Sequence, residues 1–331
     1  MQFCILGAGA WGTAMAVHLE RAGQEVMLVP RRSEHAEQLC QDRVNTDYLP
    51  EIVLKEKIKI LHSLDEALLQ AEVLLLACPS QALRGLCQSL KGYDLSRIKM
   101  LITLCKGLEQ ETWFKPCEVL KQVLPQCASG CLTGPANAKE VALGKPTAVT
   151  LASEDRQLSH TLQAALSSAT LRVYTSEDLL GVELGACLKN VYAIGAGISD
   201  GLALGDNAKA AYLTRVLHEM VFVGTAMGGQ KSTFYGLSGF GDLIATCQGK
   251  WSRNRSFGEA LAQGQAIDTL LKSRKTVVEG YGAARCFHAL CQEHSIEAPI
   301  LEQIYQVMYC NKSPSHAIQT LMERSLKQEL V

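Results

Sequence analysis

Apolar and polar residues follow two different patterns along this chain, and the change comes near residue 176. In the first part, short apolar runs alternate with amphipathic stretches, which is typical of parallel strands joined by helices. From Glu177 onward, apolar residues recur at helical spacing. The pattern predicts a doubly wound α/β domain over residues 1–180, followed by an all-helical domain over residues 181–331.

The predicted strands are short, mostly apolar runs, at residues 2–6, 25–29, 57–61, 73–77, 99–104, 129–133, 146–151 and 171–174. The clearest predicted helices of both parts lie at residues 10–22, 65–69, 155–167, 207–227, 281–293 and 299–308. A last helix is expected through Met322, with Ser313 or Ser315 as its N-cap.

A glycine-rich turn follows the first predicted strand directly. Residues 7–12 read GAGAWG and lead into a helix. In dinucleotide-binding turns the first glycine (here Gly7) permits the tight turn, and the second (Gly9) lets the backbone approach a pyrophosphate. The third (Gly12) lets helix and strand pack closely. The context predicts a Rossmann-type domain with a dinucleotide at the helix N-terminus; the alternative is a glycine-rich turn kept for packing.

The end of the second predicted strand bears on the choice of nucleotide. NAD-dependent enzymes usually have an acidic residue there, which binds the ribose hydroxyls. Here the strand is followed by Pro30, Arg31 and Arg32. Because guanidinium groups bind phosphate through charge-assisted hydrogen bonds, the pair predicts a preference for NADP, with NAD still accepted. The alternative is an ordinary exposed basic pair.

One lysine lies in a long apolar stretch of the second part. Between residues 184 and 199, Lys189 is the only charged residue. Gly185, Ala186 and Ala193 lie three or four positions from it and share its helical face, so they are expected to leave room beside the amine. Burial lowers the pKa of such an amine toward the range of a proton donor or acceptor. The simpler interpretation is a core-helix lysine that reaches out to solvent.

Other candidate residues lie at turns and helix starts. Lys106 follows the fifth predicted strand, at the edge where parallel sheets bind ligands, although a solvated loop lysine fits as well. Asp242 lies in the stretch LSGFGDLIATC and could pair with a buried lysine or cap its own helix. Ser252, Arg253 and Asn254 offer a hydroxyl, a guanidinium and an amide at a helix start, which suits a phosphate or a simple solvated cap.

Composition argues against several classes of protein. Of 331 residues, 47% are hydrophobic and 20% charged, the balance of a globular protein with a large core. The net charge of −1 provides no field for nucleic acid or an anionic membrane. No uncharged apolar run reaches the ~20 residues that span a bilayer, and the N-terminus reads as a strand and not a secretory leader. The thirteen cysteines lack a C-x-x-C pair, so we expect reduced thiols in a cytoplasmic protein without a metal site.

Several short motifs occur in an order that identifies a family. They are GAGAWG at 7–12, NTDYLP at 45–50, CPS at 78–80, KGLE at 106–109, GPANAKEVA at 134–142, ELGACLKNVYAIGAGISDGL at 183–202, LSGFGDLIATC at 237–247, SRNR at 252–255 and VEG at 278–280. Over nearly its full length the chain resembles the bacterial-type, NAD(P)-dependent glycerol-3-phosphate dehydrogenases. The fold of that family, a nucleotide-binding α/β domain followed by a helical domain, matches the pattern above.

The resemblance implies a reaction and a set of roles. The reaction is reversible hydride transfer between sn-glycerol 3-phosphate and dihydroxyacetone phosphate, which supplies glycerol 3-phosphate for phospholipid synthesis. The implied catalytic residues are Lys189 as proton acceptor and donor, Lys106 as a positive charge near the oxyanion, and Asp242 as the group that orients the ammonium or the hydroxyls. The implied substrate-binding residues are Lys106, Gly134, Ala136, Lys189, Asp242, Ser252, Arg253 and Asn254. Those implied to contact the nucleotide are Gly7, Gly9, Ala10, Trp11, Gly12, Arg31, Arg32, Lys106, Ala138, Arg253, Val277 and Glu279.

This chain departs from the family pattern at one position. The family often has GPSFA, with a serine hydroxyl near the substrate, where this chain has GPANA. Ala136 is therefore expected to contribute only its backbone, and Asn137 is a candidate to replace the lost polar contact.

Two alternatives stay open on the sequence. A related β-hydroxyacid or 6-phosphogluconate-type dehydrogenase shares the order of domains and a helix-borne lysine, although the cluster at 252–254 and the GPANAKE motif argue against it. A non-catalytic NADP-binding sensor would show no turnover, whereas this chain has Lys106, Lys189 and Asp242 together. The expected partner is a small-molecule substrate, with neither nucleic acid nor membrane insertion, and a homodimer is compatible with the sequence.

Overall fold

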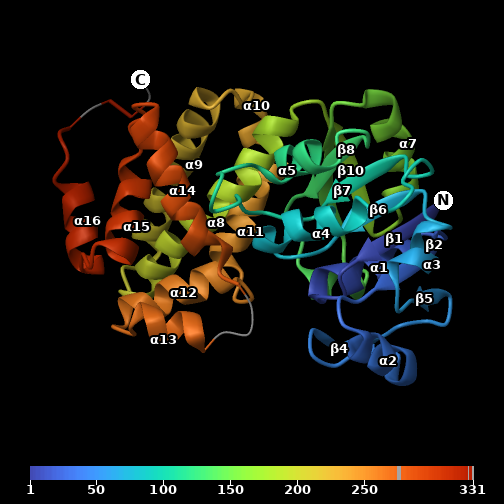
Figure 1. Cartoon of the computed structure of the whole chain (residues 1–331). Coiled ribbons are helices and arrows are strands. Elements are labelled where there is room, and N and C mark those ends of the chain that lie inside the picture. Colours follow the sequence, from blue (N-terminus) through green and yellow to red (C-terminus); the bar gives the residue numbers. More distant parts are fainter. Residues whose placement is uncertain (274–276, 327, 330–331) are drawn as a thin grey trace.

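The computed structural model describes residues 1–273, 277–326 and 328–329. Figure 1 shows the sheet of the N-terminal part with its helices at one side of the molecule and a group of helices at the other, with α8 between them. The N-terminus lies beside the sheet and the C-terminus on the helical side. The change of pattern along the sequence thus corresponds to a change of architecture.

In the described part of the chain, eight strands form one sheet in the order β10-β9-β8-β7-β6-β1-β2-β5. Their bounds are β1 Gln2–Leu6, β2 Glu25–Val29, β5 Ile58–Ile60, β6 Val73–Leu76, β7 Met100–Thr103, β8 Ser129–Thr133, β9 Thr147–Ser153 and β10 Leu171–Ser176. Each matches a strand predicted from an apolar run. The strand order runs in opposite directions from β1, which confirms the doubly wound α/β fold.

Two features of the strands were not predicted. β9 runs antiparallel to β8, and β10 runs parallel to β9. The link between β8 and β9 contains only the short helix α6 (Ala138–Ala142), so the chain turns back without a crossover helix of full length. The second feature is an antiparallel pair, β3 (Val44–Asn45) with β4 (Leu49–Val53), whose strands are short and contain no long continuous apolar run.

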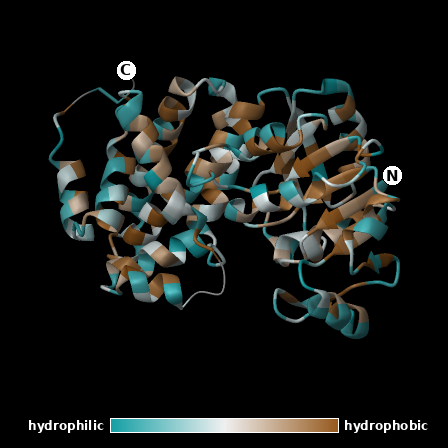
Figure 2. Ribbon diagram, in the orientation of Figure 1, coloured by the Kyte–Doolittle hydropathy of each residue, from teal (hydrophilic) through white to brown (hydrophobic). Residues whose placement is uncertain are grey.

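Helices cover both faces of the sheet and close two apolar cores. They are α1 Ala10–Arg21, α2 Ser33–Asp42, α3 Leu64–Leu68, α4 Leu83–Leu90, α5 Pro116–Val123, α6 and α7 Arg156–Leu166, with a 3-10 turn η1 at Ser80–Ala82. Phe3 and Ile5 of β1 belong to the core on one face, and Cys4 and Leu6 to the core on the other, because successive side chains of a strand point in opposite directions. Figure 2 shows the sheet as mostly hydrophobic ribbon next to more polar helices.

The described residues after β10 are helical, as predicted. The elements are α8 Leu179–Gly201, α9 Asp206–Ala226, α10 Lys231–Phe234, a π-helical turn η2 Leu237–Gly241, α11 Asp242–Gln248, α12 Arg253–Ala262, α13 Ile267–Lys272, α14 Glu279–Glu293, α15 Pro299–Tyr309 and α16 Pro314–Met322. Ser313 is the N-cap of α16, since its side chain accepts a hydrogen bond from the His316 N–H; Ser315 is not the cap.

Helix α8 connects the cores of the two parts. Leu179 and Val182 in its first turn belong to a core against the sheet, whereas Leu184 and most apolar residues after it belong to the core of the helical part. By length and composition alone α8 could cross a membrane, but 94% of its most apolar window is buried inside the protein. It is therefore a core helix that both parts share.

Candidate active site

Lys189 lies near the middle of α8, and its side chain is only 6% exposed. Its ammonium donates to Thr246 Oγ1 over 2.8 Å and lies 3.1 Å from Asp242 Oδ1. A lysine that reached out to solvent would not be buried among these partners, so this simpler interpretation of Lys189 is wrong.

The small residues near Lys189 have a different role from the predicted one. A Cβ atom on Gly185 would lie 3.0 Å from the carbonyl oxygen of Ser238 in η2. One on Gly197 would clash with the carbonyl oxygen of Arg255 in α12. The prediction that such residues leave room beside the amine is therefore wrong at Gly185. They let other backbones approach α8, which brings further candidate residues close to Lys189.

The carboxylate of Asp242 lies between two lysine side chains. Asp242 begins α11 and is 1% exposed; Oδ1 faces Lys189 at 3.1 Å, and Oδ2 accepts a hydrogen bond from Lys106 Nζ over 2.7 Å. Lys106 also donates to the Gly134 carbonyl oxygen over 2.9 Å. Because the N-cap of α11 is Gly241, Asp242 pairs with the lysines and does not cap its own helix. We call Lys106, Lys189 and Asp242 the lysine cluster.

Burial and mutual charge set the protonation of the lysine cluster. Burial lowers the pKa of Lys189 to about 8; Asp242 opposes this shift and Lys106 adds to it. Burial alone would raise the pKa of Asp242, but the two ammonium groups outweigh it and hold that pKa below its ordinary value. Asp242 is therefore ionised, and Lys189 can gain or lose a proton near neutral pH.

Thr246 belongs to the same site, and sequence reasoning missed it. It lies four positions after Asp242 on α11, hence on the same helical face. Its hydroxyl oxygen accepts from Lys189 and lies 2.6 Å from the backbone oxygen and 3.2 Å from Oδ1 of Asp242. A hydroxyl has a single proton to donate, and the oxygens within reach of this one both belong to Asp242. Thr246 therefore links Lys189 to Asp242 and fixes the position of the ammonium. The D-x-x-x-T spacing was the available signal.

A chain of amide contacts joins the lysine cluster to α12 and α14. Asn190 Nδ2 donates to the Lys106 carbonyl oxygen over 2.7 Å, and Asn254 Nδ2 donates to Asn190 Oδ1 over 2.8 Å. Asn254 Oδ1 accepts from the Gly280 N–H over 3.0 Å. Asn254, which the family resemblance assigns to the substrate, thus uses its oxygen within the protein. Asn190 was not singled out from the sequence, although it follows Lys189 directly.

Ser252 and Arg253 mark the start of α12, as the sequence predicted. Ser252 is buried, and its hydroxyl oxygen accepts from the Arg255 N–H over 3.2 Å, so it is the N-cap. The hydroxyl retains its own proton to donate. Arg253 is the first residue of the helix and is exposed.

Glu279 connects the helical part to the edge of the sheet. It begins α14, and its Oε1 accepts from the Ser80 N–H over 3.2 Å. A Cβ atom on Gly107 would clash with Glu279 Oε2 and lie 2.7 Å from Ser80 Oγ, so only glycine fits there without displacement. Val277, two positions before Glu279, is 44% exposed.

The glycine turn after β1 has the shape that a dinucleotide requires. A Cβ atom on Gly7 would clash with the Ala77 carbonyl oxygen, and one on Gly12 with the Gly7 carbonyl oxygen. By contrast, no described atom lies within 4 Å of a Cβ placed on Gly9. Trp11 Nε1 is a buried donor without a hydrogen-bond partner among the described residues. The turn is thus tightly packed at Gly7 and Gly12, is open at the backbone of Gly9, and has a hydrogen-bond donor in Trp11. These features fit a pyrophosphate at the N-terminus of α1.

Asn45 holds the β3–β4 pair against this turn. Its Nδ2 donates to the Ala8 carbonyl oxygen over 2.9 Å and to Thr13 Oγ1 over 2.7 Å, on either side of Ala10, the first residue of α1. Asn45 opens the NTDYLP motif, which served in the sequence only as a family marker. Its buried amide could be found only with the tertiary structure.

The loop after β8 contains the departure from the family pattern. Gly134 has a φ of +144°, and its carbonyl oxygen accepts the lysine hydrogen bond described above. Ala136 and Ala138 pack against a core of the sheet. Asn137 Oδ1 accepts from the Glu140 N–H over 3.2 Å and caps α6. The oxygen of Asn137 thus already has a structural partner.

Arg31 and Arg32 are exposed at the end of β2, and Arg32 is the N-cap of α2. In Figure 1 this turn lies well away from α11, where the lysine cluster is found. The structure therefore brings together the lysines, Asp242, Gly134 and the start of α12, but not the arginine pair.

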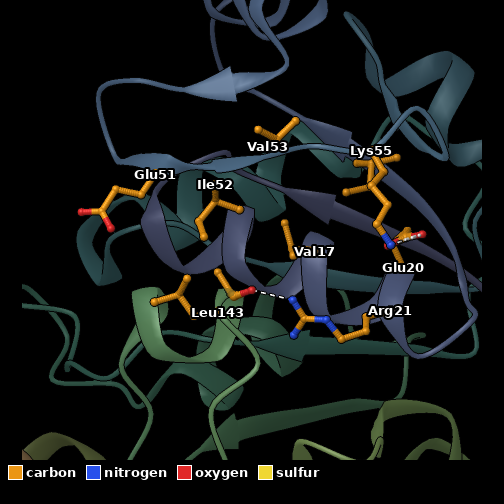
Figure 3. A pocket seen from close by; sticks show the side chains of 10 residues that line it. Val17, Glu20, Arg21, Glu51, Ile52, Val53, Lys55 and Leu143 are labelled. Carbon is orange, nitrogen blue, oxygen red and sulfur yellow. Dashed lines mark hydrogen bonds and ion pairs between the residues drawn. The ribbon is translucent and has the colours of Figure 1, made fainter.

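A cavity of about 270 Å³ lies between α1, β4 and α6 (Figure 3). In its wall Lys55 pairs with Glu20 at 3.0 Å, and Arg21 donates to the Ala142 carbonyl oxygen over 2.6 Å. None of the lining residues is a candidate site residue. Lys189, whose pKa burial lowers to about 8, lies elsewhere, in the lysine cluster.

Known proteins match this chain along most of its length. Residues 2–159 match the family described as NAD-dependent glycerol-3-phosphate dehydrogenase N-terminus, and residues 178–319 the corresponding C-terminus. "Glycerol-3-phosphate dehydrogenase [NAD(P)+] 1" of Salinibacter ruber is 41% identical over 328 residues, which cover 98% of this chain and 96% of that protein. "Glycerol-3-phosphate dehydrogenase [NAD(P)+]" of Syntrophotalea carbinolica is 41% identical over 333 residues, which cover 100% of this chain and 100% of that protein.

Solved structures agree with the sequences. The crystal structure of glycerol-3-phosphate dehydrogenase from Coxiella burnetii has a TM-score of 0.92 at 38% identity and covers 98% of this chain and 99% of that one. A D-mandelate dehydrogenase with NADH, at 16% identity and a TM-score of 0.60, shares the fold alone. With two matched halves and relatives of this similarity, the chain belongs to the NAD-dependent glycerol-3-phosphate dehydrogenase family.

Proposed function

We propose that this chain catalyses the reversible oxidation of sn-glycerol 3-phosphate to dihydroxyacetone phosphate with NAD or NADP. The observation that carries the proposal is the buried lysine cluster, in which burial lowers the pKa of Lys189 to about 8 and Asp242 holds two ammonium groups. Interconversion of an alcohol and a ketone requires such a proton acceptor and donor. The names of the full-length relatives supply the substrate.

In the proposed oxidation, neutral Lys189 removes the proton from the C2 hydroxyl, and in the reduction its ammonium protonates the forming alkoxide. Lys106 provides positive charge near the developing oxyanion, while Asp242 and Thr246 keep Lys189 in place. The nicotinamide supplies the hydride acceptor or donor. The residues of the chain thus contribute position, charge and the proton.

We infer that the start of α12 binds the substrate phosphate. Arg253 is the first residue of α12 and provides a guanidinium there, and the first N–H groups of a helix favour an anion. Ser252 can donate its hydroxyl proton, whereas Asn254 acts mainly by tying α12 to Asn190. Gly134 and Ala136 would then border the substrate with their backbone.

We propose that the dinucleotide binds along the carboxyl edge of the sheet, from Gly7, Gly9, Ala10, Trp11 and Gly12 to Lys106, Ala138, Arg253, Val277 and Glu279. The exposed Arg31 and Arg32 at the end of β2 favour the 2′-phosphate of NADP over the ribose of NAD. A preference for NADP with retained use of NAD is therefore part of the proposal.

We further propose that the enzyme works in the cytoplasm, supplies glycerol 3-phosphate for phospholipid synthesis, and forms a homodimer. The burial of α8, the apolar helix, supports a protein that does not insert into a membrane. Light scattering of the purified protein would measure its mass in solution. A mass of one chain at micromolar concentration would contradict the proposed homodimer.

The deciding experiment is oxidation of NADPH with dihydroxyacetone phosphate and, separately, with unphosphorylated dihydroxyacetone. We expect turnover with the phosphorylated ketone and a far lower kcat/KM without the phosphate. Arg253→Ala should reduce the ratio of the two kcat/KM values roughly tenfold to a hundredfold, since a hydrogen bond to a charged group contributes about 1.5–3 kcal/mol.

Arg172→Ala is the matched control, because Arg172 is exposed on β10 and lies over the Tyr174 ring. It should leave that ratio unchanged. Turnover of a β-hydroxyacid or of 6-phosphogluconate in place of the glycerol phosphate would favour a related dehydrogenase, and absence of any turnover would favour a sensor.

A further inference from the structure

The carboxyl ends of β6 and β7 place two cysteines opposite each other. The two strands are parallel neighbours, with Leu76 paired to Thr103. Cys78 and Cys105 lie two positions further along each strand. Because neighbouring strands lie ~4.8 Å apart, continuing this register brings the two Cα atoms into the range of ~4.4–6.8 Å that a disulfide spans.

The two sulfur atoms already face each other. Cys78 Sγ lies 4.0 Å from Cys105 Sγ, and the Cys105 thiol donates to the Cys78 carbonyl oxygen over 3.1 Å. A disulfide bond is ~2.05 Å long, so the sulfur atoms must approach by about 2 Å. We infer that rotation of the side chains and a shift of the two loops together bring the sulfur atoms to this distance.

The two cysteines differ in their access to solvent. Cys105 is buried, whereas Cys78 is only partly buried. The hydrogen bond with Cys78, together with burial, raises the pKa of the Cys105 thiol. Cys105 thus remains protonated, and Cys78 is the sulfur that a small oxidant meets first.

We propose that Cys78 and Cys105 form a modification site, which a hydroperoxide converts into a disulfide. In the first step the Cys78 sulfur attacks hydrogen peroxide: an S–O bond forms, the O–O bond breaks, and the departing hydroxide takes the Cys78 proton and leaves as water. The Cys105 sulfur then attacks the sulfenic acid: the S–S bond forms and the S–O bond breaks, and the departing hydroxide takes the Cys105 proton as a second water. The two thiols lose two electrons in total, and the peroxide gains two.

The neighbours of the pair link the disulfide to activity. Lys106 follows Cys105 directly, and its ammonium bridges Gly134 and Asp242. Ser80, two positions after Cys78, donates its N–H to Glu279. Drawing the sulfur atoms together shifts both loops, and a misplacement of about 1 Å in an active site can cost roughly a hundredfold in rate. This loss of rate rests on the proposed function, whereas formation of the disulfide does not.

The test is treatment of the full-length protein with hydrogen peroxide, followed by peptide mapping without reductant and by the dihydroxyacetone phosphate assay. We expect a linked peptide pair containing Cys78 and Cys105, a loss of at least about tenfold in activity, and recovery with dithiothreitol. Cys78→Ser should keep its activity through the treatment. The control Cys40→Ser removes an exposed cysteine and should respond like the wild type.

Absence of the linked pair in the treated wild type would overturn the proposal, as would linkage of Cys78 to another cysteine. Equal inactivation of Cys78→Ser, or a loss that dithiothreitol does not restore, would overturn the inhibitory effect. An untreated protein without turnover would argue against the proposed function, while the linked peptides would still establish the modification site.

Discussion

Lys189 and Glu219 are both buried ionisable residues; the first is part of helix α8 and the second contacts it. Their surroundings differ. Lys189 lies on α8; Glu219 lies on α9 and accepts from the hydroxyl of Tyr192, three residues further along α8, over 3.2 Å. Burial is the main cause of both shifts: it lowers the pKa of Lys189 to about 8 and raises that of Glu219 to about 7. A shifted pKa therefore does not by itself separate a reacting group from a structural one.

The partners separate the two. The oxygens of Glu219 also accept from the N–H groups of Ile300 and Leu301, each over 2.8 Å, in the first turn of α15. Such backbone donors would be unsatisfied without the carboxylate, so Glu219 closes a helix terminus. Lys189 instead faces a hydroxyl and a carboxylate that a second lysine shares. Its proton can therefore leave while Asp242 stays neutralised by Lys106.

Removal of the amine should have the largest effect on activity. Lys189→Met keeps the length of the side chain but deletes the proton acceptor, and loss of general acid–base catalysis typically lowers kcat by roughly 10²–10⁴. Affinity for NADPH, measured by fluorescence titration, should change little. Glu219→Gln is the control and should leave kcat of the folded protein close to that of the wild type. A Lys189→Met enzyme with nearly normal kcat would remove Lys189 from the mechanism.

Removal of the Glu219 carboxylate should lower the stability of the protein and leave its activity unchanged. Glu219→Ala leaves two buried N–H groups of α15 without an acceptor, and each such group costs about 1–3 kcal/mol. We expect the free energy of unfolding, measured in urea, to fall by about 2–6 kcal/mol, with the kcat of the remaining folded enzyme retained. If instead kcat fell while the free energy of unfolding stayed constant, Glu219 would have a role in the reaction, like Lys189.

The two groups should also respond to pH in opposite directions. The pKa of Glu219 is about 7 in the folded protein and near 4.5 when unfolded, so its contribution to stability is present below about pH 4.5 and is lost as the pH rises through 7. The loss relative to Glu219→Gln should reach about 3 kcal/mol, because one pKa unit corresponds to about 1.4 kcal/mol. Urea titrations at pH 5 and pH 8 on both proteins measure it.

Over the same range, oxidation of glycerol 3-phosphate should become faster, because it needs the neutral amine of Lys189, whose pKa is about 8. Reduction of dihydroxyacetone phosphate needs the ammonium and should slow above pH 8. Initial rates in both directions from pH 6 to 9.5 test this prediction. Parallel profiles in the two directions would assign the proton to another group.

Substitution of the exposed arginine pair should have the smallest effect on activity, in contrast to substitution of the buried Lys189. Arg31 and Arg32 are exposed, so water screens their interaction with a phosphate. Changing both to Ala should reduce the preference for NADPH over NADH by about tenfold or less, through KM for NADPH. Steady-state kinetics with both nucleotides measures the ratio. A wild-type enzyme that prefers NADH, or an unchanged ratio in the double variant, would mean that the pair is only solvated surface.

The strands, the glycine turn and the division into an α/β and a helical part were predictable because each depends on nearby residues. The apolar run at residues 3–6 identifies β1 without reference to the rest of the chain. Within the turn itself, Gly7 has a φ of +112°, and a Cβ atom on Gly12 would clash with the Gly7 carbonyl oxygen. The family motifs also identified Lys106, Lys189 and Asp242 as candidates, although not their geometry.

The tertiary structure alone decided how those candidates meet. Lys106 and Asp242 are 136 positions apart, and Lys189 and Thr246 are 57 apart. No local pattern encodes such contacts, because they depend on how closely η2 and α12 pack against α8. The same holds for the role of Gly185 and for the antiparallel direction of β9. Local sterics and hydrophobic periodicity are properties of the sequence, whereas the neighbours of a buried charge are a property of the packing.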